Sequence, residues 1–151
     1  MLVMVPLDDQ QRRLIADAQP IPGPLFAIAA DDALAETFGV EPGEEAEAAA
    51  LQMADVAGLA GAYGAGDRLV IVVAEATATV APDEADNGGV YIDGLTAADV
   101  AAFFTGQGAV PEARGLSLDA AWDLPGVQEL LGSQPLSWHD RTELLTELVQ
   151  L

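Results

Sequence analysis

The chain has 151 residues and a formal net charge of −20, because 25 aspartates and glutamates outnumber five basic residues, all of them arginines. The absence of lysine excludes P-loop phosphate binding, which needs a lysine at the β- and γ-phosphates, and Schiff-base catalysis, which needs a lysine amine. The absence of cysteine excludes disulfides and thiolate metal sites.

The first 62 residues predict strands alternating with helices. In chain order, we expect a strand over residues 2–7, a helix over 11–16, a proline-rich loop over 20–24, a strand over 25–29, and helices over 33–38 and 42–62. Aspartates precede both short helices and can cap them. The longest helix opens with three glutamates that suit the positive end of its dipole, and its alanines repeat at helical spacing.

The second part of the chain opens with the strongest strand signal, the Val/Ile run over residues 68–74. Residues 77–80 can extend this strand past a kink. A continuous apolar run indicates a central strand covered on both faces. Further along, we expect a loop over 82–89, a strand over 90–92, a helix over 96–104, a loop over 107–115, helical pieces over 117–122 and 125–131, a strand over 136–139, and a terminal helix to 151.

These elements predict a single globular domain over residues 1–151, of the α/β or α+β class, with one sheet of about four or five strands packed with helices. The hydrophobic content of 51% indicates a folded chain, since disordered acidic segments combine high charge with low hydrophobicity. The apolar run over residues 69–74 is too short to cross a bilayer, and no basic leader precedes it. We therefore expect a cytoplasmic protein with no membrane contact.

The acidic tetrapeptide Asp83-Glu84-Ala85-Asp86 has the letters of the DEAD-box helicase motif, but the chain lacks the P-loop that such enzymes need. As a calcium loop it also fails, because Ala85 and Gly94 stand where ligands are required. The segment is interpreted as a solvated loop. Together with Asp93, its acids remain the candidates for a small carboxylate- or cation-dependent enzyme or ligand-binding module. No catalytic residue, metal site or cofactor is predicted.

The segment Ser137–Arg141 holds the densest group of polar and aromatic side chains. One interpretation is structural: Asp140 caps the terminal helix, Glu143 completes a capping box, and Trp138 packs at the end of a strand. The other is a recognition patch formed by Trp138, His139 and Arg141, since tryptophan and arginine are favoured interface anchors and histidine can add pH sensitivity. These three residues are the candidate binding residues.

Four stretches of sequence carry a family resemblance. They are MLVMVPL at residues 1–7, GEEAEAAALQMAD at 43–55, RLVIVVAEA at 68–76, and PLSWHDRTEL at 135–144. Together they resemble an uncharacterised family of small actinobacterial proteins that consists of a domain of unknown function. The resemblance implies an opening strand, a long acidic-started helix, a Val-rich strand and a closing aromatic segment before a final helix. It implies no activity.

The leading functional hypothesis is a non-enzymatic protein that binds another protein or regulates it. A first alternative is an acidic mimic of nucleic acid that blocks a DNA-binding protein, with carboxylates such as Glu41, Glu44, Glu45 and Glu47 in phosphate-like positions. A second alternative is the carboxylate- or cation-dependent module described above. Direct nucleic-acid binding is not expected, because such binding needs basic side chains to neutralise phosphates. The sequence does not predict an oligomeric state.

Overall fold

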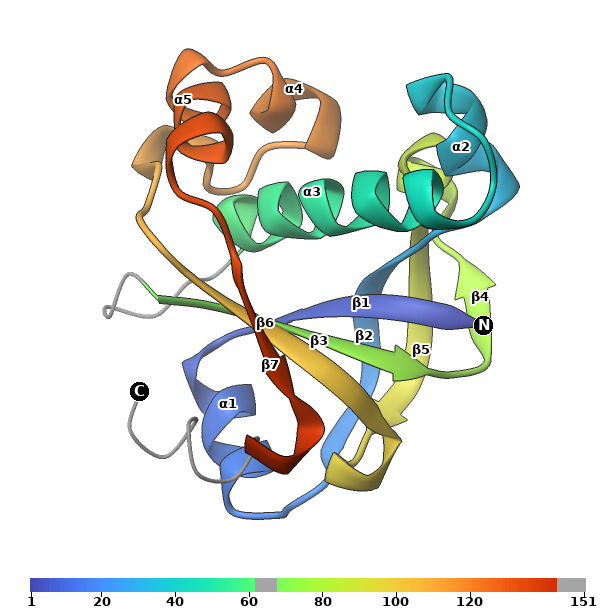
Figure 1. Ribbon diagram of the computed structural model, residues 1–151, viewed down its shortest axis with the longest axis vertical. Coiled ribbons are helices and arrows are strands. Elements are labelled where there is room, and N and C mark those ends of the chain that lie inside the picture. The colour runs from blue at the N-terminus through green and yellow to red at the C-terminus, as the bar shows by residue number, and fades with distance from the viewer. Residues whose placement is uncertain (62–67, 144–151) are drawn as a thin grey trace.

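The computed structural model describes residues 1–61 and 68–143. Its centre is one antiparallel sheet of seven strands in the order β4-β5-β2-β1-β3-β6-β7 (Figure 1). The strands are β1 Leu2–Leu7, β2 Ile21–Ala29, β3 Arg68–Glu75, β4 Ala78–Val80, β5 Gly89–Leu95, β6 Val100–Gln107 and β7 Ser137–Asp140. The predicted mixture of strands and helices is confirmed, but the sheet is larger than the four or five strands expected.

The two faces of the sheet are covered unequally. On one face, called the α3 face below, lie α2 Asp32–Phe38, α3 Glu44–Ala60, α4 Leu118–Trp122 and α5 Pro125–Ser133 (Figure 1). On the opposite face, called the α1 face, lies α1 Asp9–Ala16. Short 3-10 turns complete the fold: η1 Pro82–Asn87, η2 Ala97–Asp99, η3 Pro111–Ala113 and η4 Arg141–Glu143.

The short helices α1 and α2 begin where the side chain of a capping aspartate accepts a hydrogen bond from a backbone amide of the first turn. The Asp8 carboxylate accepts a hydrogen bond from the Gln11 amide at 2.8 Å, and Asp31 does the same for Leu34 at 2.9 Å. At the end of α2, Gly39 takes the left-handed conformation with a φ of 66°, which ends the helix without strain. These caps confirm the predicted positions of both short helices.

The core has two layers that meet at β3. Leu69 and Ile71 point to the α3 face, whereas Val70 and Val72 point to the α1 face, and all four are buried. Alternate residues of a strand point to opposite faces, so a strand with both faces covered must be apolar throughout. The prediction of a central strand in this segment is confirmed.

The helix predicted over residues 96–104 is wrong. Thr96 and Asp99 form a capping box, but the helix that it starts is only the single turn η2. From Val100 the chain enters β6, which pairs with β3 and β7. Phe103, fully buried on the α1 face, gains more from packing in the sheet than the local helix signal provides.

Two smaller differences enlarge the sheet. The proline-rich segment predicted as a loop supplies the first residues of β2, where the register with β5 shifts between Pro22 and Leu25. Residues 77–80 were expected to extend the central strand, but Ala78–Val80 forms the separate strand β4 and pairs with β5 at the edge of the sheet. Both differences arise from long-range strand pairing, which local sequence patterns do not encode.

Candidate functional site

The candidate binding residues lie on and just after β7, the last strand of the sheet. β7 pairs with β6, with Phe104 opposite Trp138 and Phe103 opposite His139. The strand predicted at this position is confirmed, although it begins one residue later. The terminal helix predicted after it falls mostly on residues 144–151, outside the residues that the structure describes.

Trp138 projects from the α3-face side of β7 and leaves most of its ring in solvent. Its strand partner Phe104 packs against the core of the α3 face, and side chains of directly paired residues share a face. The Trp138 side chain is nevertheless 61% exposed. The ring is therefore not packed into the core, and this exposure leaves it available for contact with a partner.

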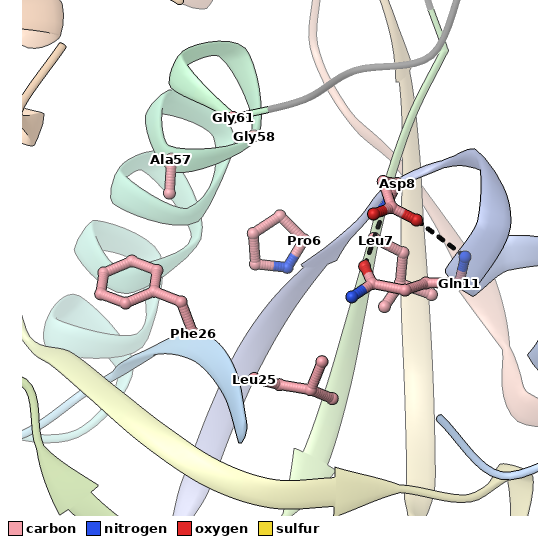
Figure 2. Close-up of a pocket in the computed structure, with 9 residues that line it drawn as sticks. All are labelled: Pro6, Leu7, Asp8, Gln11, Leu25, Phe26, Ala57, Gly58 and Gly61. Atoms are coloured by element: carbon pink, nitrogen blue, oxygen red, sulfur yellow. Dashed lines mark hydrogen bonds between the residues drawn. The ribbon is translucent and has the colours of Figure 1, made fainter. Parts of the chain in front are cut away.

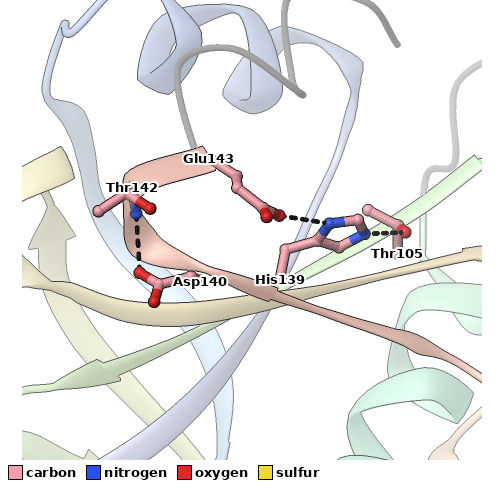
Figure 3. Close-up of polar contacts among 5 residues, drawn as sticks. All are labelled: Thr105, His139, Asp140, Thr142 and Glu143. Carbon is pink, nitrogen blue, oxygen red and sulfur yellow. Dashed lines mark hydrogen bonds and ion pairs between the residues drawn. The ribbon is translucent and has the colours of Figure 1, made fainter.

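His139 points to the other face, where three side chains fix its ring. Its Nε2 shares a hydrogen bond of 2.9 Å with the Thr105 hydroxyl, and its Nδ1 lies 2.9 Å from a carboxylate oxygen of Glu143 (Figure 3). The ring also stacks on Phe103, with centroids 4.8 Å apart and planes 13° apart. Hydroxyl, imidazole and carboxylate thus form one hydrogen-bonded chain that ties β7 to β6 and to the turn η4.

The turn η4 holds the last of the three candidate residues, Arg141, which is exposed. Just before it, the Asp140 carboxylate accepts a hydrogen bond from the Thr142 amide at 3.0 Å (Figure 3). Glu143 bonds to His139 in place of the capping-box contact that the sequence suggested. The structure therefore brings His139 to Thr105 and Glu143, and it leaves Trp138 on the opposite face of the strand.

The acidic candidates at residues 83–93 are spread over η1 and β5. The Glu84 carboxylate accepts a hydrogen bond from the Leu118 amide at 2.8 Å and so holds the start of α4. The Asp86 carbonyl accepts a hydrogen bond from the Thr37 hydroxyl of α2. Within residues 1–61 and 68–143, no group of three or more histidine, aspartate or glutamate side chains is placed to hold a metal ion.

A pocket of about 200 Å³ lies between the end of α3 and the start of α1 (Figure 2). Its lining is mostly apolar and comprises Pro6, Leu7, Asp8, Gln11, Leu25, Phe26, Ala57, Gly58 and Gly61. The two polar members, Asp8 and Gln11, bond to each other's backbone amides in a capping box. These polar atoms serve the helix end, so the pocket offers shape but little directed chemistry.

Asp55 is a buried acid that the sequence reasoning missed. It lies in α3 with 6% of its surface exposed, beside a small cavity whose lining is mostly apolar and also includes Gln107 and Gln134. Burial penalises the charged carboxylate and raises the pKa of Asp55 from 3.8 to about 7. A sequence signal was present, since Asp55 is the only charged residue between Glu47 and Asp67.

Comparison with known proteins places the chain in a family. The model of a family described as "Family of unknown function (DUF6912)" matches residues 1–149, so the chain belongs to that family. The expected resemblance to a domain of unknown function is therefore confirmed. No curated protein and no solved structure gives a significant match. Among the described residues, no helix is both long and apolar enough to cross a membrane.

Proposed function

We propose that this member of the family is a non-enzymatic cytoplasmic domain that binds an extended, basic segment of another protein along the outer edge of β7. The observation that carries the proposal is Trp138, an aromatic side chain that is 61% exposed on the terminal strand of the sheet. Tryptophan is among the residues that contribute most to protein interfaces when a partner covers it.

The backbone of β7 supplies the second part of the argument. Among the described strands, only β6 pairs with β7, so alternate amides and carbonyls of Ser137–Asp140 face outward. An extended peptide can add to such an edge through main-chain hydrogen bonds, while side-chain contacts select its sequence. Trp138 is positioned to make such a side-chain contact.

The hydrogen-bonded chain beneath β7 favours binding without reorganisation. Thr105 and Glu143 hold the His139 ring, and Phe103 packs against it. A strand that is already fixed loses less conformational freedom when a partner binds. Contacts on the face opposite Trp138 therefore hold the β7 strand in place before a partner binds.

Charge indicates the kind of partner. The formal net charge of −20 attracts a basic segment and repels an acidic one, which raises the association rate and suppresses unsuitable partners. The same charge argues against a nucleic acid or an anionic membrane surface as the ligand. An extended segment rich in lysine or arginine can pair with the β7 backbone and also carries the positive charge that the acidic protein attracts.

The test compares two exposed aromatic residues at opposite ends of the sheet. The wild-type protein, Trp138→Ala and Tyr91→Ala would each capture partners from a lysate of the source organism, followed by calorimetry with the partner's basic segment. Tyr91 is 43% exposed and lies next to the other edge strand, β4, so it is the matched control. We expect Trp138→Ala to weaken binding at least about tenfold and Tyr91→Ala to leave it unchanged. Equal affinity for all three proteins, or no partner under any condition, would contradict the proposal.

A second candidate function is mimicry of nucleic acid by the acidic end of α3. Glu41, Glu44, Glu45 and Glu47 are all exposed there, so their carboxylates can face one basic partner. Such binding would rest on charge and should weaken steeply with salt. Replacing the four glutamates with glutamines should abolish it while Trp138→Ala leaves it intact. Affinity for a nuclease or repressor that does not change at high salt would rule it out.

A further inference from the structure

A hollow of about 290 Å³ opens between the helices of the α3 face and the turn η1. It is called the Phe38–Trp122 hollow here, and its lining residues are Thr37, Phe38, Met53, Asn87, Asp119 and Trp122. The Phe38 and Trp122 rings meet edge to face, with centroids 5.4 Å apart and planes at 87°. Two aromatic walls therefore meet at a right angle, and the buried Met53 side chain adds a polarisable thioether.

The polar side of the hollow is held in place by a hydrogen bond between segments 32 residues apart. The Asn87 amide, only 3% exposed, donates from Nδ2 to the Asp119 carboxylate at 3.0 Å. Glu84 fixes the same helix by accepting from the Leu118 amide at 2.8 Å. The Asp119 carboxylate is thus anchored at the rim of an aromatic corner.

We propose that the Phe38–Trp122 hollow binds an organic cation, namely a guanidinium or an alkylammonium group. Cations bind over the faces of tryptophan and phenylalanine rings, and a fixed carboxylate adds a charge-assisted hydrogen bond. None of the six lining residues is basic, so the carboxylate and the aromatic surface of the hollow face a cation without a competing positive side chain in the lining. This site is separate from the β7 edge and does not depend on it.

The size and chemistry of the hollow select among cations. Its volume is at the lower end of small-molecule sites, which suits a side-chain-sized group. A hydrated divalent ion would require several oxygen ligands, whereas Asp119 is the only carboxylate in the lining. The cation can come from a free amine or from an arginine or lysine side chain of a partner protein, and both sources present the same chemistry.

The chain offers a direct optical probe. It contains two tryptophans, so Trp138→Phe leaves Trp122, in the hollow itself, as the only tryptophan. In this background, Trp122 fluorescence would be titrated with agmatine, with tetramethylammonium and with a short arginine-containing peptide at 150 mM salt. A neutral urea analogue of agmatine serves as the uncharged control. Tighter binding of the peptide would identify a protein side chain as the source, and tighter binding of agmatine a free amine.

Matched acid variants separate a site from general attraction to an acidic protein. Asp119→Asn and Asp123→Asn remove the same charge from neighbouring positions, but only Asp119 lines the hollow. Asparagine also keeps an oxygen that can accept the Asn87 hydrogen bond. We expect saturable binding of the cations, weakened at least tenfold by Asp119→Asn, severalfold by Phe38→Leu, and unchanged by Asp123→Asn.

Three results would overturn the proposal. They are a fluorescence response that does not saturate, an equal response to the neutral analogue, and equal weakening by Asp119→Asn and Asp123→Asn. Circular dichroism and the unfolding midpoint of each variant would confirm that it is folded. If Phe38→Leu fails to fold, the Asp119→Asn and Asp123→Asn pair still decides the result.

Discussion

Both faces of the sheet bury apolar side chains, more of them on the α3 face, but the two faces differ in their polar groups. The two buried polar residues of the described chain, Asp55 and Asn87, lie on the α3-face side. The α1 face has no such residue, although its helix α1 carries a largely buried Arg12–Asp9 ion pair, and the contacts of His139 with Thr105 and Glu143 lie where β7 ends the sheet.

This difference suggests a division of roles. A buried polar group costs free energy unless its environment compensates it, so a protein keeps such groups where they serve specificity or binding. The α3 face carries that cost at Asp55 in α3 and at Asn87 in the turn η1, and Asn87 lines the Phe38–Trp122 hollow. The α1 face contributes stability mainly through close apolar packing. The predictions below test this division, beginning with the largest expected effect.

Phe103→Ala should break the packing of the α1 face. Phe103 is 0% exposed, and its truncation removes a large side chain and leaves a cavity. We expect a loss of about 3–5 kcal/mol in the free energy of unfolding, measured by urea denaturation. Tyr91→Ala, at an exposed aromatic position, should cost far less. If Phe103→Ala lowers the free energy of unfolding by less than about 1 kcal/mol, the α1 face is not closely packed around Phe103.

Asp55→Asn should remove a pH-dependent loss of stability from the α3 face. The pKa of Asp55 is about 7 in the folded protein and 3.8 when unperturbed, so the folded state retains a proton that the unfolded state releases. Its contribution is fully present below pH 3.8 and is lost as the pH rises to about 7, above which it is constant. Relative to wild type, Asp55→Asn should gain about 3 kcal/mol between pH 5 and pH 8.

The control for Asp55 is Asp123→Asn, which removes the same charge at an exposed position. Repulsion among the many acids of the chain also lowers stability as the pH rises, and Asp123→Asn shows how much of the pH dependence changes when one exposed charge is removed. The difference between the pH profiles of the two variants therefore reports the effect of burying the Asp55 carboxylate. If urea denaturation gives the same pH profile for both variants, the Asp55 carboxylate is not desolvated as its position in α3 indicates.

His139→Ala should have an intermediate effect on stability, because His139 is only half-buried and lies on β7, at the edge of the sheet. The variant loses the hydrogen bond with Thr105 and the stacking on Phe103. We expect a cost of about 1–2 kcal/mol in unfolding free energy. Thr105→Val removes the hydrogen bond alone and should cost about 1 kcal/mol. If His139→Ala leaves the free energy of unfolding unchanged, the contacts of His139 do not hold β7 in place.

The sequence was sufficient for the elements that local chemistry dictates. Capping aspartates marked α1 and α2, a glycine marked the end of α2, and the Val/Ile run marked the central strand β3. Each of these signals acts within a few residues of the chain. The helix expected over residues 96–104 shows the opposite case, since pairing with β3 overrode the local helix signal and Val100–Gln107 forms β6.

The candidate site divides in the same way. Trp138 and His139 could be singled out by residue type and placed on one strand, but their partners could not. Thr105 lies 34 residues before His139, and Phe104, the strand partner of Trp138, lies 34 residues before it. Such contacts depend on the strand order and on helix packing, which only the folded chain defines. Asp55 differs from these contacts, because its isolation among uncharged residues is visible in the sequence and could have marked it as a buried acid.

Trp138→Ala should have the smallest effect on stability, and it sharpens the comparison at the edge of the sheet. A tryptophan packed in the core would lose about 3 kcal/mol or more on truncation. Trp138 is 61% exposed on the α3-face side of β7, so we expect a loss within about 0.5 kcal/mol. Urea denaturation of Trp138→Ala beside His139→Ala compares two neighbours on one strand that face opposite sides. A large loss for Trp138→Ala would mean that the ring supports the fold, and the partner-binding role proposed for it would lose its basis.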